Sequence, residues 1–398
     1  MPTANVPDSP VRLRALEIAR SSPESVRYVH AFFSVFGGAI NDLRATAAFR
    51  RLAGISQLGL KRGTRDVPAA MVPLCAGRES DSTELGPFVR TKHSERVCAT
   101  MVAFCSLHDV PRVDALHAAV AALFHDLGHP AFSHTVEPVL ARRGFPDHEE
   151  TGRRIVREDP EIQATFKKHG IETERVIEII REKGDLGLRQ KLCDTLAYLG
   201  HDSRLAGFPI DDAFEWNVLG LIRSVTGGAF VVDNDDKTRL YRFLVRRMDM
   251  TADLYEHPLN RVNSLFVCQL VEWLVDNGRL EAETLPRLCD SHVIAALEEA
   301  VASDAPAWAL SAWLFASHDP SESRSWEIHE CDSESGAIEL TSQSTRDRPR
   351  FLLPPIDFSG KSLPIRTPSG MTEILRCSPN ENQHHHKLWH VISYRGPV

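Results

Sequence analysis

The sequence predicts a mainly α-helical protein, a helical bundle with a small hairpin and a C-terminal segment of mixed or β character. Apolar residues recur at helical spacing through most of the chain, with interruptions at Gly and Pro. After Asp319 the composition shifts to Ser, Pro and Arg with short β-prone runs. We therefore expect an N-terminal segment over residues 1–21, a helical domain over residues 22–318 and a C-terminal segment over residues 319–398.

The composition is that of an ordinary globular protein. Of the 398 residues, 42% are hydrophobic and 25% are charged, and the formal net charge is -8. This acidic balance argues against a broad basic surface, so we expect neither stable nucleic-acid binding nor a nuclease. No apolar run has membrane-spanning length, and the eight cysteines form no CxxC pair. These features predict a cytoplasmic protein with reduced thiols and no membrane partner.

Three helices are expected in the first part of the chain. Helical patterning covers Val11–Arg20, Ser25–Phe36 and Asp42–Ile55. The next stretch, Gly59–Pro87, is rich in Gly, Pro, Ser and charged residues and shows no periodicity. We expect it to form a long loop, and long loops in a compact domain are often functional.

The most regular pattern begins at His93, whose side chain shares one helix face with a series of regularly spaced residues. The members of this series are Val97, Met101, Phe104, Cys105 and His108. The following stretch, Arg112–Asp126, is apolar nearly all round, which predicts a central, buried helix. Gly128 and Pro130 then end this helix.

A later helix carries polar side chains in register. Its core stripe consists of Leu188, Leu192 and Leu199. Asp194, Tyr198 and Asp202 lie at positions i, i+4 and i+8 on another face of the same helix. Polar groups in such a register suit the wall of a pocket.

Strands are expected only in short pieces. Ala229–Val232 and Arg239–Phe243 flank an acidic turn and are predicted to form the small hairpin. Helices are predicted to resume over residues 246–278, 290–302 and 307–316. The β-prone runs of the C-terminal segment are Ile338–Thr341, Phe351–Leu353 and Leu388–Tyr394.

Three histidines and one aspartate are concentrated in the stretch Leu123–His134. His125 and Asp126 stand at the end of the apolar helix, where unpartnered polar side chains are costly to bury. A metal ion would satisfy them, and nitrogen with anionic oxygen suits divalent Mn, Fe, Co, Zn or Mg better than a thiolate site would. Such an ion would acidify a water molecule and neutralise charge on a phosphoryl group. Neighbouring histidines could then bind phosphate or protonate a leaving oxygen.

The motif HDLGHPAFSH at residues 125–134, with His93 upstream and Asp194 downstream, resembles the H…HD…D signature of the HD phosphohydrolase superfamily. The neighbouring residues resemble one branch of it, the deoxynucleoside triphosphate triphosphohydrolases, which include the animal sterile-alpha-motif/HD enzyme. Further similar motifs are FRRLAGISQLG at residues 49–59, RTKHS at residues 90–94 and DTLAYLGHD at residues 194–202. The resemblance covers roughly residues 40–315.

This resemblance implies a divalent metal ion and a set of acid–base residues around it. The metal ligands would be His93, His125, Asp126 and Asp194. The catalytic residues would be His129 and His134, which contact the α-phosphate or the nucleophilic water, and His148, a general acid oriented by Glu149. In this branch, water attacks the α-phosphorus and releases the nucleoside together with tripolyphosphate.

The same resemblance implies a nucleotide pocket and a homo-oligomer. Arg90 would bind phosphate, Gln57 and Leu58 would contact the sugar, Tyr198 would stack on the sugar, and Asp202 would hydrogen-bond its 3′-hydroxyl. Arg261 is the arginine nearest to the position of a further substrate-binding arginine of the branch.

Some positions depart from the pattern of the branch. Thr195 stands where a phosphate-binding lysine is common, and Val262 and Leu270 stand where an arginine and base-reading groups are expected. The leading hypothesis is therefore a metal-dependent phosphohydrolase that acts on nucleotides, most simply on (deoxy)nucleoside triphosphates at the α-phosphate. The alternatives are a nucleotide 5′-phosphatase that releases inorganic phosphate, and a non-catalytic module that senses nucleotides.

Overall fold

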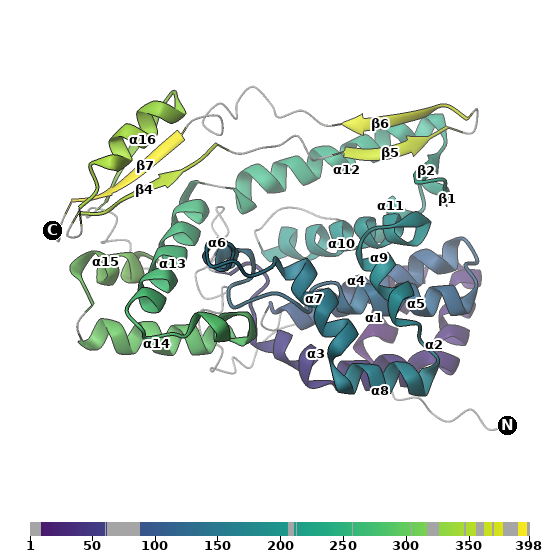
Figure 1. The fold of residues 1–398 in the computed structure, drawn as a ribbon. Coiled ribbons are helices and arrows are strands. Elements are labelled where there is room, and N and C mark those ends of the chain that lie inside the picture. The colour runs from purple at the N-terminus through teal and green to yellow at the C-terminus, as the bar shows by residue number, and fades with distance from the viewer. Residues whose placement is uncertain are drawn as a thin grey trace.

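The computed structural model describes most of the 398 residues. The described residues are 9–59, 61, 88–205, 211, 213–256, 258–303, 305–316, 326–345, 348–355, 362–367, 370–376 and 389–395. The loop expected over Gly59–Pro87 therefore lies outside the described residues, except for Gly59 and Lys61. Most of the described chain is helical, as the sequence predicts (Figure 1).

The first helices begin at residues that are suited to start them. Helices α1 (Pro10–Ala19) and α2 (Pro23–Arg44) both open on proline, and the preceding serine accepts a hydrogen bond from a backbone N–H of the first turn. A single helix over 42–55 is predicted, but the chain breaks at Thr46. The Thr46 hydroxyl accepts from the Phe49 N–H and starts a separate short helix, α3 (Ala47–Arg51).

Two consecutive helices form the centre of the main core. Helix α4 (Arg90–Leu107) contacts α1, α5 (Arg112–Phe124) and α10 (Gly184–Leu205). Every residue of α5 from Ala115 to Phe124 is buried, which confirms the prediction of a central helix that is apolar all round. His125 and Asp126 directly follow α5, so the chain enters the candidate site from the middle of the core.

The helices after α5 surround this centre. They are η3 (Ser133–Thr135), α6 (Glu137–Arg142), α7 (His148–Glu158), α8 (Pro160–His169), α9 (Thr173–Ile180) and, after α10, α11 (Phe214–Leu219). Gly128 lies in the turn after α5, directly against the first turns of α7. A Cβ on Gly128 would fall 2.0 Å from the carbonyl oxygen of His148 and 2.4 Å from the backbone nitrogen of Gly152. Only glycine permits this contact, which brings His148 next to the turn that follows α5.

A second apolar core is formed by the later helices. These are α13 (Pro258–Asp276), η6 (Ala282–Arg287), α14 (Asp290–Ser303) and α15 (Ala307–Ala316), joined to the first core by α12 (Lys237–Met250) and η5 (Thr251–Tyr255). Figure 1 shows α13–α15 on one side and α1–α5 on the other, with α6 between them. Ala131 and Phe132 are buried in the second core, whereas Leu127 is buried in the first. The turn between Leu127 and Phe132 therefore crosses from the first core to the second.

The small hairpin exists, but one of its predicted strands is wrong. Strand β2 (Ala229–Val232) pairs in antiparallel fashion with β1 (Ile222–Thr226), whereas residues 239–243 lie in α12. Gly227 and Gly228 form the turn with φ values of 58° and 74°, which side chains with a Cβ disfavour. The acidic run Asp233–Asp236 precedes α12 instead of forming the turn.

The C-terminal segment is of mixed character, and its strands divide between two sheets. Strand β7 (Trp389–Tyr394) lies between β3 (Trp326–Cys331) and β4 (Arg350–Leu353), which confirms two of the predicted runs. The third predicted run, Ile338–Thr341, is wrong, because these residues lie in helix α16 (Glu334–Ser342). The Ser333 side chain caps this helix by accepting from the Gly336 N–H.

Strands β5 (Ser362–Arg366) and β6 (Thr372–Arg376) extend the hairpin into a four-stranded sheet of order β1-β2-β5-β6. Strand β5 pairs in parallel with β2, so the C-terminal segment is not separate from the helical part. The β2 edge has unpaired backbone groups without this partner, and pairing with β5 satisfies them.

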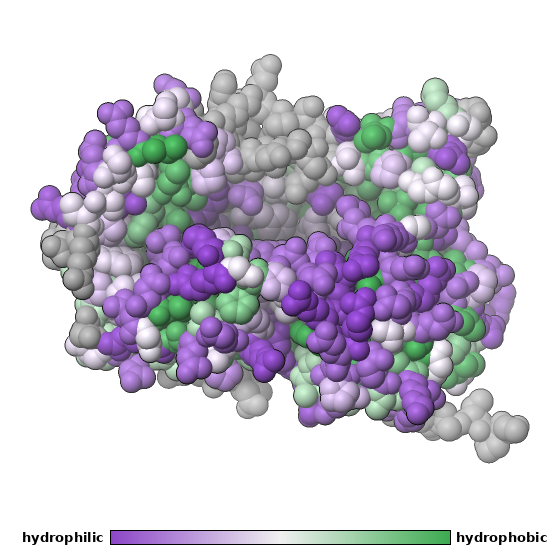
Figure 2. Space-filling model, in the orientation of Figure 1, coloured by the Kyte–Doolittle hydropathy of each residue, from purple (hydrophilic) through white to green (hydrophobic). Residues whose placement is uncertain are grey.

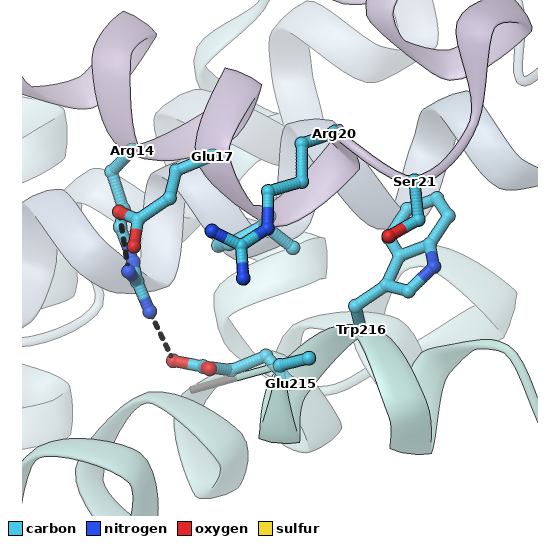
Figure 3. A pocket seen from close by; sticks show the side chains of 8 residues that line it. Arg14, Glu17, Arg20, Ser21, Glu215 and Trp216 are labelled. Atoms are coloured by element: carbon cyan, nitrogen blue, oxygen red, sulfur yellow. Dashed lines mark hydrogen bonds and ion pairs between the residues drawn. The ribbon is translucent and has the colours of Figure 1, made fainter. Parts of the chain in front are cut away.

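A buried ion-pair network connects α1 to α4 and α11. The Glu215 carboxylate lies 2.9 Å from the Arg14 guanidinium (Figure 3). It also contacts Arg96 of α4. Glu215 is only 1% exposed, and burial of a carboxylate is tolerated when it is paired in this way.

The surface in the view of Figure 2 is mostly hydrophilic, with hydrophobic residues in scattered groups. Within the described part of the chain, every helix is too short or too polar to cross a lipid bilayer.

The Gly128 contact yields a stability prediction. We expect Gly128→Ala to lower the free energy of unfolding by about 2–4 kcal/mol, because the added methyl overlaps backbone atoms that cannot move freely. Gly38→Ala is the matched control, since a Cβ there meets no atom within 4 Å. Alanine at this exposed helical position should raise stability by about 0.5–1 kcal/mol. Urea unfolding followed by circular dichroism measures both, and equal effects would contradict the close approach.

Candidate metal centre

The structure brings together the four residues that the sequence predicts as metal ligands. His93 is on the first turns of α4, His125 and Asp126 follow α5, and Asp194 is in the middle of α10. The Asp194 Oδ1 lies 2.9 Å from His93 Nε2 and 3.5 Å from His125 Nε2. The Asp126 carboxylate lies 3.5 Å from His93 Nε2 and 3.3 Å from His125 Nε2. The donor atoms of His93, His125 and Asp126 lie within 4.8 Å of one another, and Asp194 contacts both imidazole nitrogens.

The donors fit a divalent cation. His125 Nδ1 lies 2.9 Å from the Ala122 carbonyl oxygen, which fixes the ring so that Nε2 points at the two carboxylates. His125 Nε2 is buried and has no hydrogen-bond partner among the described residues. Neutral imidazole and carboxylate donors suit Mn, Fe, Co, Zn or Mg, and the two carboxylates would balance the charge of the ion.

The charges at this point favour a cation there. Burial lowers the pKa of His125, but the carboxylates of Asp126 and Asp194 outweigh it and raise that pKa to about 9. Burial would raise the pKa of Asp194, yet its contacts with His125 and His93 hold it below its usual range. The carboxylates are therefore ionised and favour positive charge beside them. A divalent ion would supply this charge in place of the proton on His125, and the imidazole nitrogens would then be free to act as ligands.

Arg90, the first residue of α4, lies beside the candidate ligands and is buried. One guanidinium nitrogen donates to Asp126 Oδ2 at 2.6 Å, Nε donates to the Ser133 hydroxyl at 2.8 Å, and the third nitrogen donates to the Gln57 carbonyl at 3.3 Å. Burial alone would raise the pKa of Asp126, but Arg90 and the neighbouring histidines hold it well below its usual range. Arg90 thus connects the candidate ligand Asp126 to the Ser133 side chain and to the Gln57 backbone.

A second cluster of imidazoles lies next to the first. His129 Nε2 is 3.3 Å from Asp126 Oδ1, and its ring stacks on that of His148 with 4.0 Å between centroids. The His134 ring meets both others edge-on, at 4.7 Å and 5.0 Å. Together with Glu137, these three histidines form a group that could also hold a metal ion.

The carboxylate in contact with His148 is that of Glu137 and not that of Glu149. Glu137 contacts His148 Nδ1 with one oxygen and lies 3.0 Å from His134 Nδ1 with the other. The Glu149 side chain is 61% exposed and pairs with Arg153 at 3.2 Å. The sequence prediction of Glu149 as the orienting residue is wrong in geometry, because adjacent residues of a helix point about 100° apart. The spacing His134-x-x-Glu137 was the signal that could have identified Glu137.

The pKa values of His148 and His129 in the second cluster are shifted in opposite directions. Burial lowers the pKa of His148, but the bond to Glu137 and its charge outweigh burial and raise that pKa. Burial and the charge of Arg90 instead hold the pKa of His129 well below its usual value. His148 is therefore the imidazole best suited to carry a proton, and His129 the one suited to stay neutral.

The polar register of Asp194, Tyr198 and Asp202 on α10 is present, and its last two members are bonded to basic or aromatic partners. The Tyr198 hydroxyl accepts from Arg247 Nε at 2.8 Å, and Asp202 accepts from the Tyr255 hydroxyl at 2.6 Å. The two tyrosine rings meet edge-on at 5.7 Å. Asp202 is 1% exposed, and burial raises its pKa to about 7.

The remaining expected substrate residues lie in different surroundings. Gln57 and Leu58 lie in the segment that bonds to Arg90, and the Gln57 side-chain oxygen is buried without a hydrogen-bond partner among the described residues. Arg261 on α13 instead pairs with Glu256 at 3.5 Å and donates to the Pro354 carbonyl. Lys61, absent from the sequence prediction, is within electrostatic range of Glu256, Arg90 and Asp202. It lies in a stretch without periodicity, so no pattern marks it.

A cavity of about 220 Å³ adjoins Thr195, the residue after Asp194. It lies between α10, α12 and strands β2 and β5. Its lining includes Lys191, Leu192, Phe230, Arg247 and Leu363. The Thr195 hydroxyl donates to the Lys191 carbonyl at 3.0 Å, so this position presents no positive charge.

The raised pKa of Asp202 predicts how stability depends on pH. Between its ordinary value of 3.8 and about 7, the folded protein holds a proton that the unfolded chain has released. Stability must therefore fall as pH rises through this window and level off above it.

Asp202→Asn keeps an acceptor for Tyr255 and removes the titration. We expect the stability of the variant relative to wild type to rise by about 2–3 kcal/mol between pH 5 and pH 8. Urea unfolding at pH 5, 6, 7 and 8 measures the difference. A difference that does not change with pH would show that Asp202 is ionised throughout.

Comparison with known proteins agrees with this geometry. Residues 90–206 match the family model of the HD domain. No curated protein matches the chain significantly. A hypothetical protein from Aquifex aeolicus is 21% identical with a TM-score of 0.63, covering 90% of this chain and 92% of its own. A phosphohydrolase from Bacteroides thetaiotaomicron is 17% identical with a TM-score of 0.63, covering 89% and 94%. These likenesses concern the fold, and the stretch that matches the HD-domain model, residues 90–206, contains all four candidate metal ligands.

Proposed function

We propose that this protein is a metal-dependent phosphohydrolase that acts on nucleotides and cleaves (deoxy)nucleoside triphosphates at the α-phosphate. The observation that carries the proposal is the group formed by His93, His125 and Asp126, with Asp194 in contact with both histidines. A second imidazole cluster lies directly beside it. The HD domain and the similar fold of a phosphohydrolase support this reaction class. The sequence motifs support the nucleotide substrate and the products, a nucleoside and tripolyphosphate.

The residues divide into binding and acid–base roles. The four ligands would hold a divalent ion, which acidifies water and neutralises charge on a phosphoryl group when bound. Arg90 and neutral His129 face the same point and would bind phosphate oxygens. His134 lies at the outer edge of the cluster, where its exposed ring can reach an entering phosphate.

His148 would supply the proton that the leaving oxygen needs. Its contact with Glu137 raises its pKa and fixes its ring. A general acid works best when its pKa lies near the working pH, and the carboxylate provides this adjustment. Tyr198 would stack on the sugar and Asp202 would hydrogen-bond its hydroxyl. The raised pKa of Asp202 suits this hydrogen bond.

One observation favours a second candidate, a nucleotide 5′-phosphatase. Thr195 occupies the position next to Asp194, and its hydroxyl is bonded back to the helix. A triphosphate carries more negative charge than a monophosphate, and this position adds no cation for it.

Product identification tests the proposal and separates the two candidates. Protein loaded with Mn, Fe, Co or Mg is incubated with each dNTP, NTP and nucleoside monophosphate, and the products are resolved by chromatography. We expect nucleoside and tripolyphosphate in equal amounts. Inorganic phosphate released only from monophosphates would establish the second candidate, and no turnover of any nucleotide would refute both.

Removal of a ligand provides the control for metal dependence. His125→Ala should lose bound metal and at least about a hundredfold in kcat, because the ion supplies both charge and orientation. His169→Ala is the matched control, since this histidine pairs with Asp42 at 2.7 Å and not with the site. Metal content by mass spectrometry and kcat should be unchanged in this control.

The two glutamates near His148 give a sharper test. Glu137→Gln should lower kcat about 10–100-fold, because His148 loses its charge partner and its orientation. It should also move the basic limb of the kcat–pH profile to lower pH, since the pKa of His148 falls. Glu149→Gln should change kcat by less than about twofold, because its pair with Arg153 is exposed. Equal effects of the two variants would contradict the assignment of Glu137.

A further inference from the structure

A carboxylate from the second half of the chain reaches into the turn that carries His129 and His134. Asp290 is the first residue of α14 and is 6% exposed. One of its oxygens accepts from the Phe132 backbone N–H at 2.6 Å, and the other accepts from the Ser56 backbone N–H at 2.9 Å. Asp290 thereby joins two segments that flank the candidate site, although both segments are far from Asp290 in the sequence.

The turn that Asp290 holds has an unfavourable backbone. Phe132 has φ 55° and ψ 22°, and Ser133 has φ 54°, so two consecutive residues with a Cβ are left-handed. Such conformations persist only where surrounding contacts impose them, and they concentrate at functional sites. Here the Phe132 ring is buried in the second core, and its N–H is bonded to Asp290.

The same two segments orient Arg90. The Ser133 hydroxyl donates to the Ser56 carbonyl at 2.6 Å and accepts from Arg90 Nε at 2.8 Å. Arg90 in turn donates to Asp126 at 2.6 Å. Because Asp290 bonds the backbone of both Phe132 and Ser56, it fixes the support on which the Ser133 hydroxyl and Arg90 meet.

Adjacent contacts bring the start of α14 against the site and fix its position. Cys289 Sγ lies 3.6 Å from the Arg51 carbonyl and so close to Gly54 that a Cβ there would be 2.8 Å away. The Arg51 guanidinium donates to the carbonyls of Leu127 and His129 at 2.7 and 2.9 Å. The start of α14, and with it Asp290, is therefore held in place by close contacts with residues 51–54.

We propose that Asp290 is a positioning residue that sets the direction of His134 and Arg90 relative to the metal ligands. This inference rests on the proposed function for its catalytic consequence, because these two residues are assigned there to phosphate. Within the described part of the chain, the hydrogen bonds of Asp290 come from the backbone amides of Ser56 and Phe132, so it acts through them and not as a metal ligand.

Two variants and one control test the proposal in metal-loaded, full-length protein. Asp290→Ala removes both acceptors, and Asp290→Asn keeps the size and one acceptor. Asp159→Ala is the control, because Asp159 also accepts two backbone N–H groups at a helix start, those of Glu161 and Ile162, but away from the site. The readouts are kcat, KM, bound metal, melting temperature and the imidazole signals of ¹⁵N-histidine-labelled protein.

We expect Asp290→Ala to lower kcat about 10–100-fold with metal content unchanged, as displaced catalytic groups do. Asp290→Asn should show a smaller loss of kcat and a melting temperature close to wild type, so it reports even where the alanine variant does not fold. The signals of His129 and His134 should shift in both variants and stay in place in Asp159→Ala.

Other outcomes would overturn the proposal. A lower melting temperature with unchanged kcat and unchanged imidazole signals, as in Asp159→Ala, would assign Asp290 to stability alone. Loss of the metal would assign it to the ligands. Failure of the proposed function is distinguishable, because wild type would then turn over no nucleotide while the imidazole signals still report whether Asp290 sets the turn.

Discussion

The buried pair of Arg90 and Asp126 is the interaction on which the rest of the site depends. Their side chains are 4% and 6% exposed, and the two atoms lie 2.6 Å apart. The Asp126 carboxylate and the imidazoles of His93 and His129 are removed from water here. A buried charge is tolerated only where it is paired and fully bonded. Arg90 compensates Asp126 on one side, and the free side of the two carboxylates is where a divalent ion would lie. The Arg90 bonds to Ser133 and Gln57 carry this constraint into the flanking backbone.

The site lies where the two apolar cores meet, and this explains its composition. The chain leaves the first core at Leu127 and enters the second at Ala131, so Gly128, His129 and Pro130 occupy the boundary. Polar side chains at a boundary between cores can be held rigidly without filling either core. The Gly128 contact with α7 then brings His148 to the same boundary. Rigid placement of this kind allows catalytic groups to keep their geometry without reorganisation.

The sequence was sufficient for features that depend on local periodicity or on a motif. The spacing from His93 and the apolar run before His125 predicted α4 and α5, because burial repeats with the helical period. Contacts between distant segments were beyond it. The parallel pairing of β5 with β2 and the two bonds of Asp290 join residues more than a hundred positions apart. The hairpin partner was wrong because Gly227 and Gly228, and not the acidic run, form the turn.

The error at Glu149 shows why a motif alone does not define the chemistry. The motif places His148 and Glu149 side by side, yet a helix directs them to different faces, and Glu137 from the preceding segment meets the imidazole. Asp290 extends the same reasoning to the second core. The match to the HD-domain model ends at residue 206, but Phe132 within it is hydrogen-bonded to Asp290, the first residue of α14. Substitutions that loosen the packing of α14 would therefore change the geometry of the candidate site through the Asp290 carboxylate. The geometry of the candidate site, at the boundary between the cores, then depends on the packing of the second core.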